Sequence, residues 1–106
     1  MRMELLPQAE HDLETIGDYI AEDSLRRAAS FVRELKAQCR KIAQAPKAYR
    51  PRTEFGATMR SCSHGNYVIL FTENASLVQI VRILHSAMDI DALFAEKPSG
   101  FDKKAT

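Results

Sequence analysis

The chain has 106 residues, of which 45% are apolar and 27% are charged, so it fits one globular domain and is not wholly disordered. No apolar run approaches the roughly 20 residues that a membrane-spanning helix needs, and no secretory signal is expected, which predicts a cytoplasmic protein. The net charge is only +1, but residues 1–24 are strongly acidic and residues 33–60 strongly basic, which predicts a charged partner.

Residues 1–5 alternate apolar and polar side chains, which predicts a short first strand that ends before Pro7. The spacing then becomes helical, and Ser24 is a suitable N-cap for a second helix that ends near Pro46. Because about three residues separate the two helices, they are predicted to form an antiparallel hairpin over residues 8–45. Its buried positions are expected to be Leu13, Ile16, Ile20, Leu25, Val32, Leu35, Cys39 and Ile42, with Phe31 beside them.

Residues 46–57 are rich in proline and basic side chains and are predicted to form a loop. Three strand-like runs follow, at residues 58–63, 66–73 and 77–84, separated by turn sequences. They are expected to form an antiparallel meander whose last two runs are central, because those runs are richest in valine and isoleucine. The first strand must join the same sheet, either at its edge or beside a later strand.

The predicted fold class is therefore α+β, with an N-terminal strand and an α-helical hairpin packed on an antiparallel sheet, in the order β-α-α-β-β-β. Asp89 is expected to cap a short C-terminal helix that holds Ile90, Leu93 and Phe94. Residues 1–96 are assigned to a single domain, and residues 97–106 to a polar, flexible tail.

The expected core depends on which face of the sheet the helices cover and on the state of the two cysteines. Both sheet faces are apolar, so the pattern does not decide which set of sheet side chains the helices cover. The two possibilities are the set Val68, Leu70, Val78 and Ile80, or the residues that alternate with them along the strands. Cys39 and Cys62 are expected to be buried thiols rather than a disulfide. They are the only cysteines and lie outside metal-ligand spacing, so a cysteine-rich zinc site is excluded and no metal or cofactor is expected.

Four arginines are the first candidates for binding a phosphate or carboxylate group. Arg50 and Arg52 flank Pro51 in the predicted loop, where ordinary solvation is the alternative to a binding role. Arg60 and Arg82 lie on strands, and if these strands are antiparallel the two side chains are predicted to approach one another on one sheet face. For Arg82 the alternative is a structural ion pair with Glu54, Glu73 or Asp89.

His85 and Asp89 lie four residues apart just after the last predicted strand, where a histidine and a carboxylate are candidates for acid–base chemistry. The favoured interpretation is structural: His85 hydrogen-bonds the backbone where the strand ends, and Asp89 caps the helix that follows. His64 lies in a turn, and the sequence contains no nucleophile-elbow or phosphate-loop motif.

Three segments resemble the RelE/ParE superfamily of bacterial toxins from type II toxin–antitoxin systems. The segment LLPQAEHDLETIGDYIAED is similar to the family's first strand and acidic first helix, and CRKIAQAPKAYRPR to the end of its second helix and the following loop. The segment MRSCSHGNYVILFTENASLVQIVRILHSAMDID is similar to its sheet and terminus. A strand that ends in histidine, followed by methionine or arginine and then an acid, indicates the ParE branch. The resemblance covers about residues 3–94.

The resemblance implies one of two activities. ParE-like toxins inhibit DNA gyrase, whereas RelE-like toxins cut messenger RNA in the ribosomal A site with bases and arginines on the sheet, commonly with a C-terminal tyrosine or histidine. No tyrosine follows Tyr67 in this chain, so a ParE-like gyrase inhibitor without catalytic residues is expected. The alternative is a RelE-like ribosome-dependent endoribonuclease that uses Arg60, Arg82 and His85.

The resemblance also implies a cognate ParD-like antitoxin that binds this chain tightly in a hetero-oligomer. Such an antitoxin is expected to lay an amphipathic helix and an extended segment along the toxin, with apolar anchors near Leu5, Ile20 and Phe31. Its acidic residues are expected to meet the basic side chains of Arg33, Arg40 and Arg52. The candidate contacts to the target are Arg50, Arg52, Arg60, Arg82 and His85, and direct nucleic-acid binding is left open.

Overall fold

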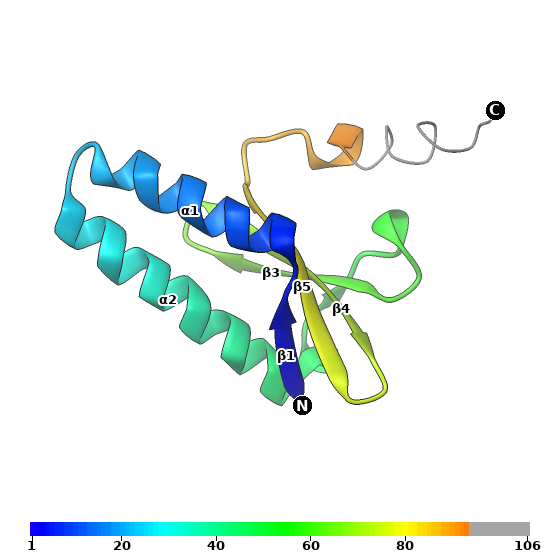
Figure 1. Cartoon of the computed structure of the whole chain (residues 1–106). Helices are drawn as coiled ribbons and strands as arrows, with labels where there is room; N and C mark the ends of the chain where they lie inside the picture. Colours follow the sequence, from blue (N-terminus) through cyan, green and yellow to red (C-terminus); the bar gives the residue numbers. More distant parts are fainter. Residues whose placement is uncertain (94–106) are drawn as a thin grey trace.

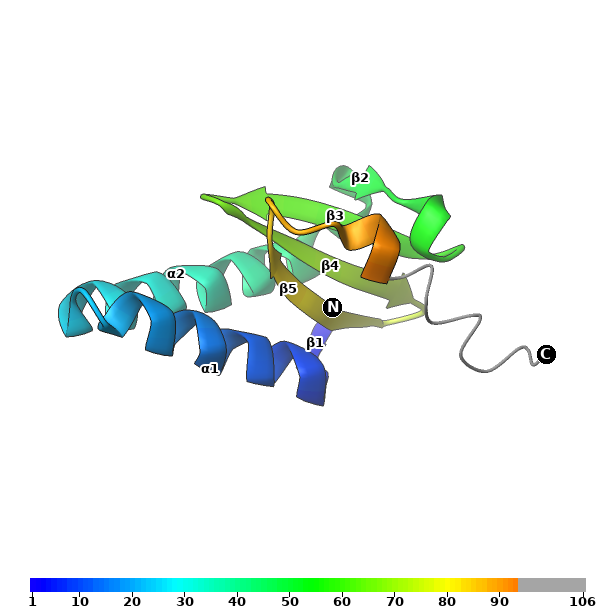
Figure 2. The same cartoon turned by 90° about the horizontal axis from the view of Figure 1, so that it is seen from above.

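The structure is a computed structural model that describes residues 1–93. Strand β1 (Arg2–Leu5) is followed by helix α1 (Pro7–Ala21), helix α2 (Leu25–Gln44) and a connection that contains the two-residue strand β2 (Arg50–Pro51). The strands β3 (Met59–His64), β4 (Tyr67–Asn74) and β5 (Leu77–His85) complete the sheet, whose order is β1-β5-β4-β3-β2. Both helices lie on one face of this sheet (Figure 1, Figure 2). The predicted α+β fold is thus confirmed.

The helical hairpin begins and ends where the sequence signals predict. Pro7 occupies the start of α1, where its missing N–H is not needed. The Ser24 hydroxyl caps α2 by accepting the backbone N–H of Arg27 at 3.1 Å. The two helices lie close together at Gly17, where an added Cβ would lie 3.4 Å from Cγ2 of Val32, at the limit of ordinary van der Waals contact.

The main core lies between the hairpin and the sheet. The predicted hairpin positions that are buried in it are Leu13, Ile16, Phe31, Leu35, Cys39 and Ile42. Ile20 and Val32 are partly buried and pack against the same cluster. The prediction for Leu25 is wrong, since this side chain is 78% exposed. Leu25 begins α2 at the tip of the hairpin, which extends past the sheet (Figure 1).

The opposite face of the sheet carries a second, smaller cluster. Met59, Leu70 and Leu84 are buried there, under the partly buried side chains of Phe55, Val68, Val81, Ile90 and Leu93. The side chains that face the helices are instead Ile69, Phe71, Val78, Ile80 and Ile83. Both faces read as apolar in the sequence because both are covered, one by the hairpin and the other by the segments that contribute Phe55 and Leu93.

The remaining elements agree with most of the predicted boundaries. Strand β1 joins the sheet at its edge, parallel to β5, whereas every other strand pair is antiparallel. The predicted loop over residues 46–57 contains two 3₁₀ turns, Pro46–Ala48 and Thr53–Phe55, besides β2. A helical turn begins at Ile90. Phe94 of the predicted C-terminal helix, the end of the predicted domain 1–96 and the predicted tail 97–106 lie outside the described residues.

The two cysteines are buried and unbridged, as predicted. Burial raises the pKa of the Cys39 thiol to about 11, with a further contribution from nearby Cys62. Burial also raises the pKa of Cys62. Within residues 1–93 no group of histidine, cysteine and acidic side chains is arranged to hold a metal ion. No helix in this part of the chain is long and apolar enough to cross a membrane.

Candidate functional site

Arg82 on β5 is held by Asp12 on α1. Its Nε donates to Oδ2 of Asp12 at 2.8 Å and its Nη2 donates to Oδ1 at 3.0 Å, which is the two-point geometry that guanidinium and carboxylate groups favour. The backbone N–H of Ile83 donates to the same Oδ2 at 2.9 Å. Asp12 is 8% exposed, and its hydrogen bond raises the pKa of the Arg82 guanidinium against the opposing effect of partial burial. Arg82 therefore fastens the last strand to the first helix.

The predicted alternative for Arg82, a structural ion pair, is confirmed, but all three predicted partners are wrong. The carboxylate of Glu54 accepts from Nε of Arg52 at 2.8 Å. Glu73 lies 4.0 Å from Nζ of Lys47. Asp89 caps the helical turn after β5, because its Oδ1 accepts the N–H of Ala92 at 3.1 Å. The capping role predicted for Asp89 is thereby confirmed.

Arg60 does not approach Arg82. In the sheet register, Arg60 of β3 is paired with Phe71 of β4, and Arg82 of β5 is paired with Leu70 of β4. Phe71 and Leu70 are neighbours in the chain, and their side chains occupy opposite faces of the sheet. The Nη1 of Arg60 instead donates to the backbone oxygen of Tyr49 at 2.7 Å. The predicted meeting of these two cations is wrong, because Arg60 is bound to the backbone of Tyr49, Arg82 is bound to Asp12 on α1, and β4 separates their strands.

The loop arginines have different surroundings. Arg52 stacks its guanidinium 4.7 Å from the ring centroid of Phe55 and donates to Glu54 and, at 3.3 Å, to the hydroxyl of Ser61. Arg50 pairs with Ser61 across the β2–β3 ladder and is exposed. The hydrogen bond from Arg52, supported by the charges of both arginines, lowers the pKa of the Glu54 carboxyl. Of the predicted target contacts, Arg50 is the one most open to solvent.

The two histidines near the end of the sheet have structural contacts. The Nδ1 of His85 accepts the N–H of Ala87 at 3.0 Å, which confirms the predicted backbone hydrogen bond after the strand. The ring of His85 meets Tyr67 edge-on with centroids 5.1 Å apart. His64 lies 5.7 Å from Phe31 by ring centroids, and its Nε2 is 3.6 Å from Glu34. The aromatic rings of Phe31 and Tyr67 lie in contact with one another between these two histidines.

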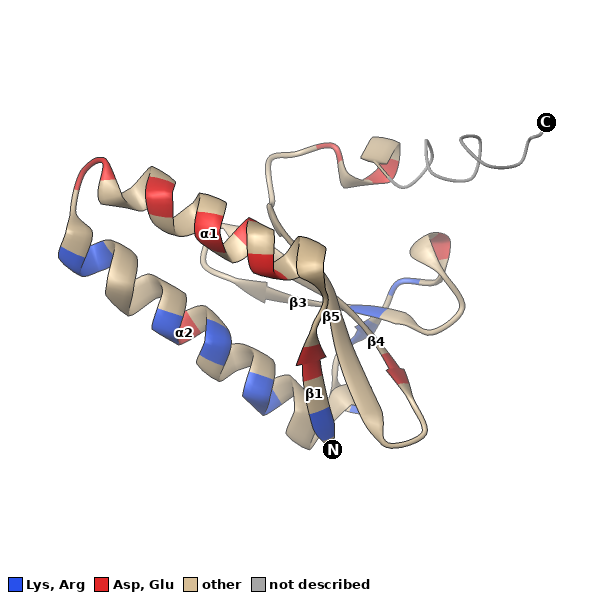
Figure 3. Cartoon of the chain, in the orientation of Figure 1, with Lys and Arg blue, Asp and Glu red and all other residues tan. Residues whose placement is uncertain are grey.

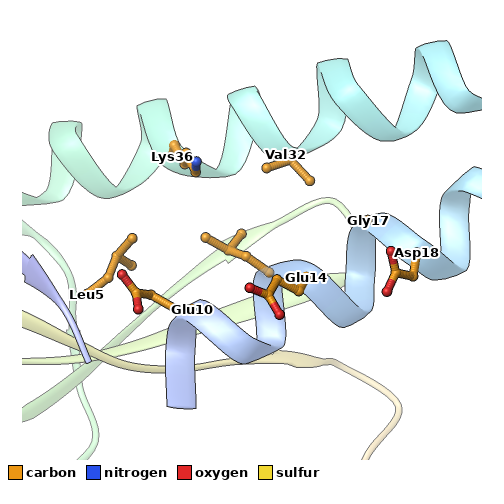
Figure 4. Close-up of a pocket in the computed structure, with 8 residues that line it drawn as sticks. Leu5, Glu10, Glu14, Gly17, Asp18, Val32 and Lys36 are labelled. Carbon is orange, nitrogen blue, oxygen red and sulfur yellow. The ribbon is translucent and has the colours of Figure 1, made fainter. Parts of the chain in front are cut away.

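A groove of about 610 Å³ runs between the two helices (Figure 4). Its apolar lining comes from Leu5, Leu13 and Val32, together with the backbone of Gly17. Along the α1 side stand three carboxylates at a spacing of four residues, Glu10, Glu14 and Asp18, and the α2 side presents Lys36. Figure 3 shows this division continuing along the hairpin, with acids on α1 and bases on α2. The groove is therefore apolar at its base and oppositely charged at its two rims.

The structure separates the predicted antitoxin contacts. Leu5 lines the groove, and Ile20 is partly buried farther along α1. Phe31 is only 7% exposed and packs under Tyr67 and His64, so it does not offer an accessible anchor. The remaining predicted contacts are the exposed Arg33 and Arg40 on α2, and Arg52, which packs against Phe55 on the sheet face away from the helices.

Three residues of interest are not among the predicted site residues. Asp12 carried a usable signal, because it falls at helical spacing between Ala9 and Ile16 on the apolar stripe, where an acid requires a partner. Tyr19 and Met88 are large apolar side chains that are 67% and 46% exposed. Their sequence positions resemble those of ordinary core residues, so no signal distinguished them.

The fold and sequence resemble those of known toxins. A family model described as "ParE toxin of type II toxin-antitoxin system, parDE" matches residues 3–90. Toxin ParE1 of Caulobacter vibrioides is 31% identical over 86 residues, which cover 80% of this chain and 88% of that toxin. A solved structure titled "Chromosomal ParDE TA system from P. aeruginosa" has the same fold, with a TM-score of 0.68 at 20% identity over 80% of this chain and 95% of that chain.

Proposed function

This chain belongs to the ParE toxin family of type II toxin–antitoxin systems, and we propose that it inhibits DNA gyrase and is neutralised by tight binding of a cognate ParD-like antitoxin. The observation that carries the proposal is the match to the family model over residues 3–90, which includes the whole hairpin and the sheet except for Arg2 at the start of β1. Both proposed partners are cytoplasmic proteins, so we place the action of the toxin in the cytoplasm.

The contacts of the sheet arginines support gyrase inhibition over RNA cleavage. Attack of a 2′-hydroxyl on a phosphate needs a base, an acid and cations that converge on one phosphate. Arg60 and Arg82 lie on strands that β4 separates, Arg60 is bound to the backbone of Tyr49, and Arg82 is already bound by Asp12. We therefore treat Arg82 as a structural residue and keep two loop arginines as the candidate target contacts: Arg50, which is exposed, and Arg52, whose side chain is 18% exposed.

The groove between α1 and α2 is the proposed seat of an antitoxin helix. An amphipathic helix would bury its apolar side on Leu5 and Val32. Because the rims carry opposite charges, its acidic flank would face Lys36 on α2 and its basic flank would face the carboxylates of α1. Arg33 and Arg40 are exposed on α2 outside the lining of the groove, and we keep them as candidate contacts for acidic antitoxin residues that extend past it. The apolar base gives affinity that persists in salt, while the rims give an association rate that falls as salt rises.

Two assays on one preparation test the activity. We expect the purified toxin to inhibit supercoiling by gyrase and to leave ribosome-bound messenger RNA intact in primer extension. Addition of the antitoxin encoded beside the toxin gene should restore supercoiling. Codon-positioned cuts in the messenger, with supercoiling unaffected, would establish the RelE-like endonuclease in place of the gyrase inhibitor.

A further inference from the structure

A second hollow of about 410 Å³ lies on the other side of α1 from the inter-helix groove. It is bounded by α1, the end of β5 and the turn that follows the strand. The side chains that line it include Thr15, Ile16, Tyr19, Tyr67, His85 and Met88. Two of these, Tyr19 and Met88, are large apolar residues left 67% and 46% exposed. Clustered apolar exposure of this kind marks an interaction site more often than an ordinary surface.

The edge of β5 opens beside this hollow. Strand β1 accompanies β5 only as far as Ile80, whose carbonyl accepts the N–H of Leu6 at 3.0 Å. Beyond that point a bulge opposite Leu70 and Phe71 of β4 shifts the register, and Ile83 directs its N–H outward to Asp12. Beyond Ile80, the outer edge of β5 is therefore bound by the carboxylate of Asp12 and not by a neighbouring strand.

The alternation of a β-strand places two backbone groups on this open edge. The N–H and C=O of one residue point to the same side, and every second residue points the same way. Because the N–H of Ile83 points outward, its C=O and both backbone groups of His85 do so as well. The His85 carbonyl accepts the N–H of Met88 at 3.0 Å. The Ile83 carbonyl and the His85 N–H have no partner within residues 1–93, so one acceptor and one donor stand side by side.

We propose that an extended segment of the antitoxin adds to this edge of β5 and places an apolar or aromatic side chain in the hollow. Its backbone would donate to the Ile83 carbonyl and accept from the His85 N–H, as in strand addition to a sheet edge. Its anchor side chain would pack between Tyr19 and Met88. The anchor is uncharged, because the Asp12 and Arg82 side chains of the lining already neutralise one another.

The position of the hollow favours the antitoxin as the occupant. The inter-helix groove uses Glu14, Gly17 and Asp18 of α1, and the hollow uses Thr15 and Tyr19 from the same turns of the helix. A helix is about 10 Å wide, and an extended chain covers about 3.3 Å per residue. About three or four residues would therefore carry one chain across α1 from the groove to the hollow. The inference rests on the proposed antitoxin partner and assigns a second contact to it.

The test compares two matched variants in binding to the purified antitoxin encoded beside the toxin gene. Tyr19→Ser removes one wall of the hollow, and Leu25→Ser removes an even more exposed apolar side chain at the hairpin tip, outside the hollow. Loss of a buried interface anchor commonly costs affinity by about tenfold or more. We expect that loss for Tyr19→Ser and unchanged affinity for Leu25→Ser. Thr15→Trp, which fills the hollow from an exposed helix position, should weaken binding by a similar factor.

Hydrogen exchange gives an independent readout of the strand addition. The His85 amide should exchange rapidly in the isolated toxin and become strongly protected in the complex. Unchanged affinity in both Tyr19→Ser and Thr15→Trp, or an unprotected His85 amide in the complex, would overturn the inference. Loss of gyrase inhibition with unchanged antitoxin affinity would assign the hollow to the target and also overturn it. Failure of the wild-type toxin to bind the antitoxin would instead refute the proposed function.

Discussion

Asp12 and Arg82, seventy positions apart in the sequence, join the first helix to the last strand through hydrogen bonds of 2.8 and 3.0 Å. The same carboxylate accepts the N–H of Ile83 where β5 has run past the end of β1. One acidic side chain therefore neutralises a partly buried cation and also satisfies a backbone donor that lacks a neighbouring strand. This makes Asp12 a residue on which the packing of α1 against the sheet depends.

Replacing Asp12 is expected to destabilise the fold. Asp12→Ala leaves the guanidinium of Arg82 and the N–H of Ile83 without their acceptor, and loss of one partner from a buried pair typically costs about 3–5 kcal/mol. Arg82 is partly exposed, so we expect a loss near the lower end, about 3 kcal/mol. Asp12→Asn keeps an acceptor and should lose less. Urea unfolding measures both, with the exposed Glu14→Ala as control, and an Asp12→Ala protein as stable as that control would contradict the prediction.

The partner of Arg82 illustrates what the sequence can and cannot determine. Its location inside an apolar strand was enough to predict that it needs a partner or an open face. To predict Asp12 as that partner, one must know where α1 lies along β5. This position follows from the parallel pairing of β1 with β5 and from the register shift after Ile80. Neither feature has a local sequence signal. The expected meeting of Arg60 and Arg82 does not occur, because β4 separates their strands and each guanidinium has its own acceptor.

Local signals, by contrast, determined most of the fold. The Ser24 cap, the apolar stripe that includes Leu35 and the valine-rich strands each depend on near neighbours in the chain, and the structure contains all of them. Leu25 fits the same stripe by spacing but lies at a hairpin tip that extends past the sheet. Periodicity identifies the face of a helix that turns inward, but it does not show where along the helix the covering layer ends.

Leu35 and Leu25 offer a matched test of that distinction. Leu35 is fully buried, so Leu35→Ala should lower the free energy of unfolding by about 2–5 kcal/mol through the cavity it leaves. Leu25→Ala should change it by less than about 0.5 kcal/mol, because the side chain is already in solvent. Guanidinium unfolding of both variants measures the difference. Similar losses in the two proteins would mean that the hairpin tip is covered after all.

The buried thiol of Cys39 predicts a loss of stability at high pH. Its pKa is raised to about 11, so between the ordinary thiol pKa and that value the unfolded chain releases a proton that the folded chain keeps. The free energy of unfolding should therefore fall in this range, by up to about 1.4 kcal/mol per pH unit for each such thiol. Urea unfolding from about pH 8 to about pH 10 should show a shallower fall for Cys39→Ala than for the wild type. Identical slopes would contradict the buried, protonated thiol.

The exposed arginines of α2 lead to a prediction about antitoxin association. Reversal of Arg33 and Arg40 to glutamate should weaken binding about tenfold at low salt, mainly through slower association, and the difference should shrink as salt rises. The same reversal at Arg52 should have a smaller effect, because that side chain packs on Phe55 away from the helices. Surface plasmon resonance at several salt concentrations measures the rates. An effect at Arg52 equal to that at the α2 arginines would place the antitoxin's acidic residues on the loop instead.

His85 provides the prediction that separates the two toxin mechanisms. If His85 were the acid or base of an RNA-cleaving site, its replacement by glutamine would lower the rate about 10²–10⁴-fold, because an amide does not titrate in this range. In the structure its Nδ1 accepts the N–H of Ala87, a bond that a glutamine side-chain oxygen can also accept. We therefore expect His85→Gln to retain most of its growth inhibition and its inhibition of supercoiling. His85→Ala, which lacks the acceptor, should lower stability by about 1 kcal/mol and serves as the control for a structural role. Loss of toxicity in His85→Gln at unchanged stability, together with the disappearance of codon-positioned cuts in ribosome-bound messenger RNA, would make His85 a catalytic residue and the protein an endoribonuclease.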